Sequence, residues 1–512
     1  MPQIGYQWLS NTYGVVPVHP FAVQSEIGRM RSSATDGDIR REVYPAAYRP
    51  AATLPDHLTF AFRYEGIHLE FLARLYSLDS VRNELEAWIA REPTGAYARR
   101  ACFFYEWLMP RPLNAPSASR GNYVDALSPD EFIVGTAINN RRWRVRDNLP
   151  GNRDFCPLIR RIDAIRRAES YDLAAPLAKL EADYGVDLIM RSAVWLTVKE
   201  SRASFLIEHE QDNEDRIRRF AAVMESECGR HANPFDSQAL IDLQRGILGQ
   251  SALRYGIRRS PVYVGHVARY EPVVDYIAPH WQHIDAMLAG LCQFLERTSE
   301  GAPIVRAAAA SFGFVYVHPM ADGNGRISRF LINDVLRRDG AVPAPIILPV
   351  SATITQSTRD RAAYDKVLER FSRPLMKHYA DQYSFGKNER GEDGVEYNLH
   401  FHAYDDALPA WRYPDLTAHV SYLAAVIHST LTQEMRNEAR FLHANDEARR
   451  AIKNFLEAPD NDLDSIIRSV RQNGNSISNS LRKRYPLFDE RPDLSAQIIH
   501  AITQAFPDDT GP

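Results

Sequence analysis

The stretch that decides the fold runs from Phe312 to Arg329 and reads FGFVYVHPMADGNGRISR. An apolar run leads to His318, and Pro319 disfavours a helical continuation from that histidine. A turn with two glycines follows, where positive φ angles and close backbone approach are permitted. A helix is then predicted from Arg326 to about Arg337, because apolar residues recur at helical spacing at Ile327, Phe330, Leu331 and Val335.

This arrangement of a loop before a helix suits phosphate chemistry. The first N–H groups of a helix lack internal partners, and the helix dipole attracts negative charge. Arg326 and Arg329 are three residues apart and can share one helix face, where their planar donors suit phosphate oxygens. Asp322 can give Mg²⁺ a carboxylate ligand, and His318 can act as a general base near neutral pH. The stretch therefore predicts attack by a hydroxyl on a magnesium-bound phosphate.

Composition places the chain among ordinary globular proteins. Its 512 residues predict two to four domains, with 45% hydrophobic and 25% charged residues. A net charge of −4 does not indicate a nucleic-acid or anionic-membrane partner. The four scattered cysteines favour reduced thiols and a cytoplasmic location. We expect no signal peptide and no membrane span, because no window approaches the length of an apolar spanning segment.

Periodicity along the chain predicts an all-α protein with one small β-hairpin. Residues 1–56 are rich in Pro and Gly and predict an irregular arm, whereas 58–100 have helical periodicity. A further helix is expected near Ser237, with Asp236 or Ser237 as its N-cap. Residues 261–265 are short and β-branched, which predicts a strand. After the polar break at 386–394, the chain is again mostly helical.

The segment His318–Arg329 resembles the signature of the Fic family, HPFxDGNGRxxR. Met320 stands where the family usually has Phe, and we expect this adaptable side chain to anchor the loop in the core. The resemblance implies a small helical core that transfers AMP from ATP to a Ser, Thr or Tyr hydroxyl of a target protein. By analogy, His318 would deprotonate the hydroxyl and Asp322 would bind Mg²⁺. The residues that would hold the phosphates are Gly323, Asn324, Gly325, Arg326 and Arg329.

Neighbouring segments resemble further parts of the family. Residues 259–265 resemble the hairpin flap that aligns the target chain by main-chain pairing, and the residues concerned are Val262, Tyr263, Val264 and Gly265. Tyr364 matches a tyrosine near the nucleotide base, although a core position is an equal alternative. Asn333, one turn past Arg329, is a further nucleotide candidate.

Many Fic proteins carry an inhibitory helix with the motif [S/T]xxxE[G/N]. Ser204 and Glu208 have this spacing, upstream of His318. The glutamate of such a motif pairs with the second arginine, here Arg329, and blocks the γ-phosphate. Glu65 is an alternative, with Gly66 after it but Ala61 in place of the Ser or Thr.

The resemblance covers roughly residues 196–375, so three regions are expected: a mainly helical 1–195, the Fic core, and a helical 376–512. We expect the flanks to select targets or to mediate self-association as a homodimer. Residues 476–485 favour a solvated helix with a basic tip over a helix-turn-helix. Alternatives for the core are transfer of UMP, phosphocholine or phosphate, removal of AMP, or a non-catalytic regulator with a DNA-binding C-terminal region.

Overall fold

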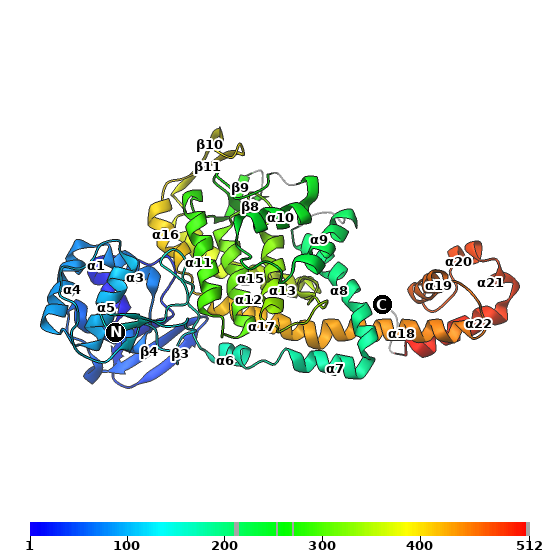
Figure 1. Cartoon of the computed structure of the whole chain (residues 1–512), viewed down its shortest axis with the longest axis horizontal. Coiled ribbons are helices and arrows are strands. Elements are labelled where there is room, and N and C mark those ends of the chain that lie inside the picture. The colour runs from blue at the N-terminus through cyan, green and yellow to red at the C-terminus, as the bar shows by residue number, and fades with distance from the viewer. Residues whose placement is uncertain (209–213, 252–253, 269–270, 508–512) are drawn as a thin grey trace.

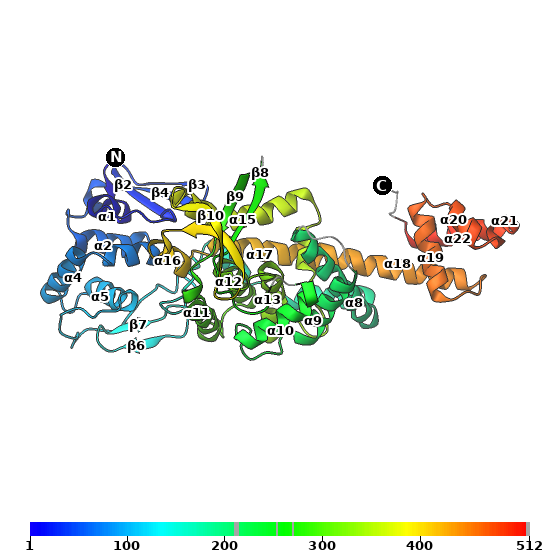
Figure 2. The same ribbon diagram turned by 90° about the horizontal axis from the view of Figure 1, so that it is seen from above.

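The computed structural model describes residues 1–208, 214–251, 254–268 and 271–507. Its elements lie in three bodies along one long axis (Figures 1 and 2). The N-terminal elements form one end, a helical core lies in the middle, and one long helix leads to a C-terminal helical cluster. Separate clusters of buried apolar side chains underlie these bodies. The core cluster includes Phe155 and Ala439, beyond the predicted boundaries after 195 and 375, which stay predictions.

The N-terminal body combines helices with two small sheets. A four-stranded sheet has the order β1-β2-β4-β3, in which β2 and β4 are parallel, and a three-stranded sheet has the order β5-β7-β6. The elements are β1 (Gln3–Ile4), α1 (Tyr6–Tyr13), β2 (Val23–Gly28), β3 (Ser32–Asp36), β4 (Ile39–Pro45), η1 (Ala46–Tyr48), α2 (Leu54–Tyr64), α3 (Leu69–Tyr76), α4 (Asp79–Arg91), α5 (Ala96–Leu108), β5 (Val124–Asp125), β6 (Ile138–Asn140) and β7 (Val145–Asp147).

The irregular arm predicted for residues 1–56 is therefore wrong, since this segment holds α1 and the four-stranded sheet. Strand β2 alternates between buried and partly exposed positions, but Ser25 occupies one of the buried ones. Strand β3 is exposed throughout. Neither strand therefore shows the apolar alternation by which a half-buried strand is recognised.

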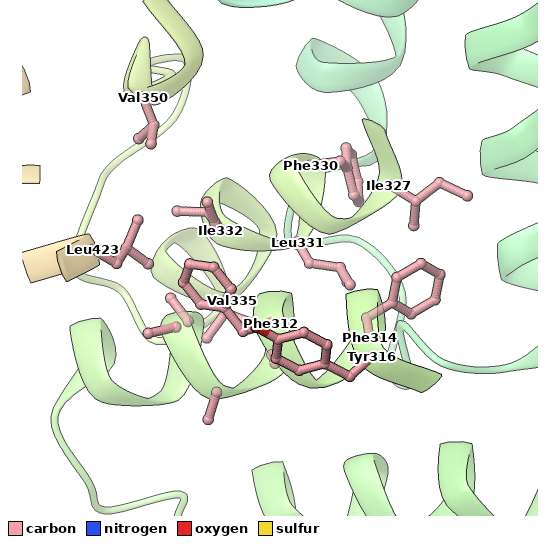
Figure 3. Close-up of a cluster of buried hydrophobic side chains, with 14 of the residues drawn as sticks. Phe312, Phe314, Tyr316, Ile327, Phe330, Leu331, Ile332, Val335, Val350 and Leu423 are labelled. Atoms are coloured by element: carbon pink, nitrogen blue, oxygen red, sulfur yellow. The ribbon is translucent and has the colours of Figure 1, made fainter. Parts of the chain in front are cut away.

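The core is helical, as expected, and its centre is the packing of two consecutive helices, α12 (Pro303–Val317) and α13 (Asn324–Arg338). Figure 3 shows side chains of both helices meeting in one cluster. The predicted apolar stripe of α13 is buried at all four positions. The other core helices are α6 (Asp163–Glu169), α7 (Ala174–Tyr184), α8 (Val186–Ile207), α9 (Glu214–Glu227), α10 (Ser237–Leu248), η2 (Gly249–Ser251), η3 (Trp281–His283), α11 (Ile284–Arg297), α14 (Val350–Ile354), α15 (Thr358–His378), α16 (Tyr404–Arg412) and α17 (Thr417–Ser429).

Two hairpins lie on the core. The first pairs β8 (Tyr263–Ala268) with β9 (Glu271–Ile277) in antiparallel register, and matches the predicted strand. The second pairs β10 (Tyr383–Arg390) with β11 (Glu396–Phe401), where the sequence suggested only a polar break. Both views place the two hairpins side by side (Figures 1 and 2), and the rings of Tyr263 and Phe385 are 5.6 Å apart.

The C-terminal body follows a π-helical turn, η4 (Thr430–Glu434), and the long helix α18 (Met435–Lys453). Its helices are α19 (Asp460–Gln472), α20 (Asn479–Arg484), α21 (Leu487–Glu490) and α22 (Pro492–Ala505). At the basic tip, Arg482 and Arg484 form ion pairs with Asp489 and Asp462. Among the described helices, none has both the length and the apolar character that crossing a membrane requires.

Candidate active site

The loop between α12 and α13 is held by its own side chains. Helix α12 ends at Val317 and is capped by His318, which adopts a left-handed conformation with φ of 49°. Asn324 closes the loop, because its Oδ1 accepts from Met320 N at 2.9 Å and its Nδ2 donates to Met320 O at 2.8 Å. Met320 is fully buried, so the expectation that it anchors the loop is confirmed. The Asn324 side chain braces the loop, which leaves only its backbone N–H for an anion.

The His318 ring has a defined tautomer. Its Nδ1 lies 3.1 Å from the carbonyl oxygen of Val315. A carbonyl can only accept a hydrogen bond, so Nδ1 carries the proton and Nε2 is left with its lone pair. Burial, followed by the positive charge of Arg258, lowers the pKa of the imidazole to about 4. At neutral pH the ring is therefore uncharged and can accept a proton at Nε2.

The N-terminus of α13 faces α8, and both arginines of the motif lie on that side. Arg326 stacks over the ring of Phe205 at 5.0 Å, and Arg329 is only 2% exposed. The prediction that these arginines share one helix face is therefore confirmed. Gly323 caps the helix with φ of 85°. Together, the helix N-terminus and two buried guanidinium groups make a strongly positive pocket.

Glu208 fills this pocket. Its Oε1 accepts a hydrogen bond from Arg329 Nη2 at 2.7 Å, while Arg329 Nε donates to Ser204 Oγ at 2.8 Å. A Cβ added to Gly325 would lie 2.1 Å from Glu208 Oε1, so the carboxylate lies directly against the first turn of α13. Burial raises the pKa of Glu208, but Arg329 and Arg326 outweigh it and hold the pKa below its ordinary value. Glu208 is therefore a bound anion.

The alternative inhibitory residue, Glu65, lies in the N-terminal body. Its Oε2 accepts from the backbone N–H of Tyr6 at 2.8 Å. The carboxylate that pairs with Arg329 is that of Glu208. The pairing with Arg329 that the motif implies is therefore made by Glu208 and not by Glu65.

Asp322 stands at the edge of the pocket, where one carboxylate oxygen is 3.7 Å from Arg326 Nη2 and the side chain is 31% exposed. In the described ranges, no group of three His, Cys, Asp or Glu side chains is arranged around a metal position. Mg²⁺ usually takes only one or two protein carboxylates and fills its other positions with water and substrate phosphates. A single partly exposed carboxylate beside two buried arginines and a helix N-terminus fits that ion.

Two other nucleotide candidates, Tyr364 and Asn333, have buried side chains. Tyr364 is buried, which raises the pKa of its hydroxyl, and the charge of Arg329 opposes that shift. Tyr364 thus occupies a core position, and its hydroxyl lies close to Arg329. Asn333 donates to Leu348 O at 3.1 Å and accepts from Leu348 N at 2.8 Å. Both ends of this buried amide are therefore occupied by the chain itself, and the expected nucleotide contact of Asn333 is not supported.

The flap residues flank the His318 loop. Tyr263, Val264 and Gly265 lie in β8, with a bulge between Val264 and Gly265. Val262 precedes the strand, and its carbonyl accepts from Ala278 N at 3.1 Å. On the flap surface, Val264 is 43% exposed and Val273 of β9 is 37% exposed. A two-stranded hairpin with exposed apolar residues can accept a further strand.

Sequence reasoning missed two buried residues that support the loop. Gln244 on α10 donates from Nε2 to Asp322 O at 2.8 Å. Arg258 donates from Nε to His318 O at 2.7 Å. Neither residue stands in a recognisable motif. An amide within an amphipathic helix and one of two adjacent arginines before a strand give no local signal of burial.

The geometry agrees with comparisons to known proteins. Residues 234–336 match the model of the Fic/DOC family. Protein adenylyltransferase fic-1 of Caenorhabditis briggsae is 35% identical over 143 residues, which is 27% of this chain and 26% of that protein. Protein adenylyltransferase Fic of Drosophila melanogaster is 35% identical over 112 residues, or 22% of this chain and 21% of that protein. This chain therefore contains a Fic domain, and it spans about a quarter of the length of these relatives.

Among solved structures, a Fic family protein from Desulfovibrio desulfuricans is similar at a TM-score of 0.35 and 18% identity, covering 68% of this chain and 84% of that chain. A Fic domain containing signaling protein from Bacteroides thetaiotaomicron has a TM-score of 0.34 and 19% identity, covering 53% of this chain and 98% of that chain.

Proposed function

We propose that this protein transfers AMP from ATP to a Ser, Thr or Tyr hydroxyl of a target protein. The observation that carries the proposal is the neutral His318, whose free Nε2 belongs to the same short loop that opens the N-terminus of α13. A proton acceptor thus stands beside an anion pocket with two buried arginines. The names of the relatives, protein adenylyltransferases, agree with this chemistry.

In this reaction the target hydroxyl attacks the α-phosphorus of ATP, and its proton passes to His318 Nε2. The bond between the α-phosphorus and the bridging oxygen breaks, and pyrophosphate leaves. The N–H groups at 323–325 would hold the α- and β-phosphates, and Arg326 and Arg329 would hold the remaining charge. Catalysis would depend on positioning and on fixed positive charge.

Mg²⁺ would be held by the carboxylate of Asp322. When bound there, the ion supplies positive charge that neutralises the phosphate oxygens. Gln244 keeps the backbone of Asp322 in place, because its Nε2 donates a hydrogen bond to the Asp322 carbonyl oxygen. The carboxylate is thereby carried by a fixed main chain beside Arg326.

We also propose that Glu208 holds the enzyme idle. Its carboxylate occupies the arginine and the helix N-terminus that the γ-phosphate would need. A hydrogen bond to a charged group contributes about 1.5–3 kcal/mol, and this pair would oppose phosphate binding by an amount of that order. Release of the end of α8 would therefore activate the site.

The flap would align an extended segment of the target by main-chain pairing, and the flanking bodies would select that target. We place the protein in the cytoplasm as part of this proposal, since all four cysteines are free thiols.

The test is intact-mass analysis of Glu208→Gly after incubation with ATP and Mg²⁺, beside the double variant Glu208→Gly, His318→Ala. We expect one or more AMP adducts on the first protein and a rate lower by about 10²–10⁴-fold on the second. UTP, CDP-choline and GTP serve as parallel donors. If ATP gave no adduct and another donor gave one, the transferred group would be the one from that donor and not AMP.

A further inference from the structure

Arg258 is a buried cation with an unusual set of partners. It is 1% exposed, and its guanidinium donates to three backbone carbonyls. Within the described ranges no carboxylate forms an ion pair with it. Burial lowers the pKa of Arg258 to about 10, so the side chain is still charged at neutral pH.

The three carbonyls belong to different parts of the site. Nη1 donates to Ser260 O at 3.0 Å and Nη2 to Pro279 O at 2.7 Å. Ser260 lies just before β8 and Pro279 just after β9, so one guanidinium holds both ends of the flap. The third bond, from Nε to His318 O at 2.7 Å, reaches the left-handed residue that carries the proton acceptor.

The main chain reinforces this link. Arg258 N donates to Pro319 O at 2.9 Å, and Ile257 forms an antiparallel bridge with Met320. The segment before the flap is therefore paired directly with the loop after His318. The flap and the histidine share one connector, and a shift of the flap is transmitted to the histidine backbone.

Burying an unpaired guanidinium is unfavourable, and an apolar residue of similar volume often stabilises a fold equally well or better. Lysine could not replace it, because a single ammonium cannot reach three carbonyls in the fixed fork of arginine. The residue type is therefore better explained by the geometry that it imposes than by stability.

We propose that Arg258 is a positioning residue that fixes the flap-bound target hydroxyl relative to His318 Nε2. This inference rests on the proposed function. It predicts that Arg258 governs the rate of transfer while leaving ATP binding alone, because its contacts are with the flap and the histidine backbone.

Asp393 provides a matched control. Its Oδ2 accepts from Arg259 N at 2.7 Å and from Ser260 Oγ at 3.0 Å. It thus holds the same end of the flap from the β10–β11 side, and among the described residues it forms no hydrogen bond with the His318 loop. Loss of Asp393 loosens the flap without releasing the histidine.

The experiment compares Arg258→Met, Arg258→Lys and Asp393→Asn in the Glu208→Gly protein. Self-modification at saturating ATP is followed by intact mass, and ATP affinity by calorimetry. We expect Arg258→Met to slow modification by about 10²-fold and Arg258→Lys by about 10-fold, with ATP affinity within twofold. Asp393→Asn should slow it by less than about 5-fold. Equal losses for Arg258→Met and Asp393→Asn, or a parallel loss of ATP binding, would overturn the proposal.

A second measurement needs no transfer. In ¹⁵N-histidine spectra, the Nδ1 proton of His318, assigned by its loss in His318→Ala, should be visible in the parent and broadened or lost in Arg258→Lys. An unchanged signal in both Arg258 variants would contradict the positioning role. Absence of adducts in the parent, with this signal still dependent on Arg258, would instead count against the proposed function.

Discussion

Two glutamates in different bodies of the molecule occupy nearly the same local position. Glu65 follows the last residue of α2, and Glu208 follows the last residue of α8. Each carboxylate lies against a glycine at the N-terminus of another helix. An added Cβ would be 2.2 Å from Glu65 Oε2 at Gly5, and 2.1 Å from Glu208 Oε1 at Gly325.

The pKa values of the two carboxyl groups are nevertheless shifted in opposite directions. Burial raises the pKa of Glu65 to about 8, although the N–H of Tyr6 donates to it. The pKa of Glu208 stays below its ordinary value, because Arg329 and Arg326 outweigh burial. A helix N-terminus alone therefore does not keep a buried carboxylate charged, and the arginines do. The α13 pocket is suited to an anion of any origin, whereas the α1 contact is suited to a neutral acid.

The largest expected effect comes from removing Arg329, the arginine that Glu208 has as a partner and Glu65 lacks. In the Glu208→Gly protein, Arg329→Met should lower the rate of AMP transfer by about 10²–10³-fold, because a fixed positive charge on the phosphates is lost. Arg361→Met is the control, since Arg361 donates to Ile207 O at 2.8 Å and touches the same end of α8. Similar rates for both variants would show that Arg329 has no special role.

The second effect concerns ATP affinity and uses the same substitution at both glutamates. Glu208→Gln should tighten ATP binding by about 5–150-fold, because the competing charge is removed from Arg329. Glu65→Gln should leave ATP affinity unchanged, because its helix lies in another body. Calorimetric titration with ATP and Mg²⁺ measures both. Unchanged affinity in Glu208→Gln would remove the basis for autoinhibition.

The third effect is on stability and belongs to Glu65. A folded-state pKa of about 8, above the value of 4.5 for an unperturbed glutamate, means that the folded protein binds this proton more tightly than the unfolded chain. The resulting stabilisation is complete below pH 4.5 and is lost as the pH rises toward 8. Glu65→Gln cannot lose a proton, so its free energy of unfolding should rise relative to that of the parent by about 1 kcal/mol or more between pH 5 and 8, as measured by thermal melting. If the free energies of unfolding of the two proteins changed equally with pH, the pKa of Glu65 would not be raised.

Sequence reasoning recovered the α12–α13 unit because its signals are local. Pro319, the loop glycines and the apolar stripe of α13 each constrain neighbouring residues. It also found Ser204 and Glu208, because they match the inhibitory motif of the Fic family. The N-terminal sheet was missed because Ser25 interrupts the apolar alternation of β2. The role of Arg258 was missed because its three acceptors lie 2, 21 and 60 residues away, where no local pattern can relate them.

The smallest expected effect comes from removing one hydrogen bond within the contact between α8 and α13. Ser204→Ala removes one hydrogen bond to Arg329 but leaves the bonds from Arg329 to Ser204 O, at 3.0 Å, and to Glu208. A single hydrogen bond of this kind contributes about 0.5–1.5 kcal/mol, so ATP affinity should tighten by only about 2–10-fold. Ser328→Ala is the matched control, because this buried serine donates to Gly325 O at 2.7 Å within α13 and, in the part of the chain that the structure describes, forms no hydrogen bond to the Arg329 side chain. If Ser204→Ala tightened ATP binding as much as Glu208→Gln, the hydroxyl and not the carboxylate would hold Arg329 in place. The comparison of the two glutamates would then lose its explanation.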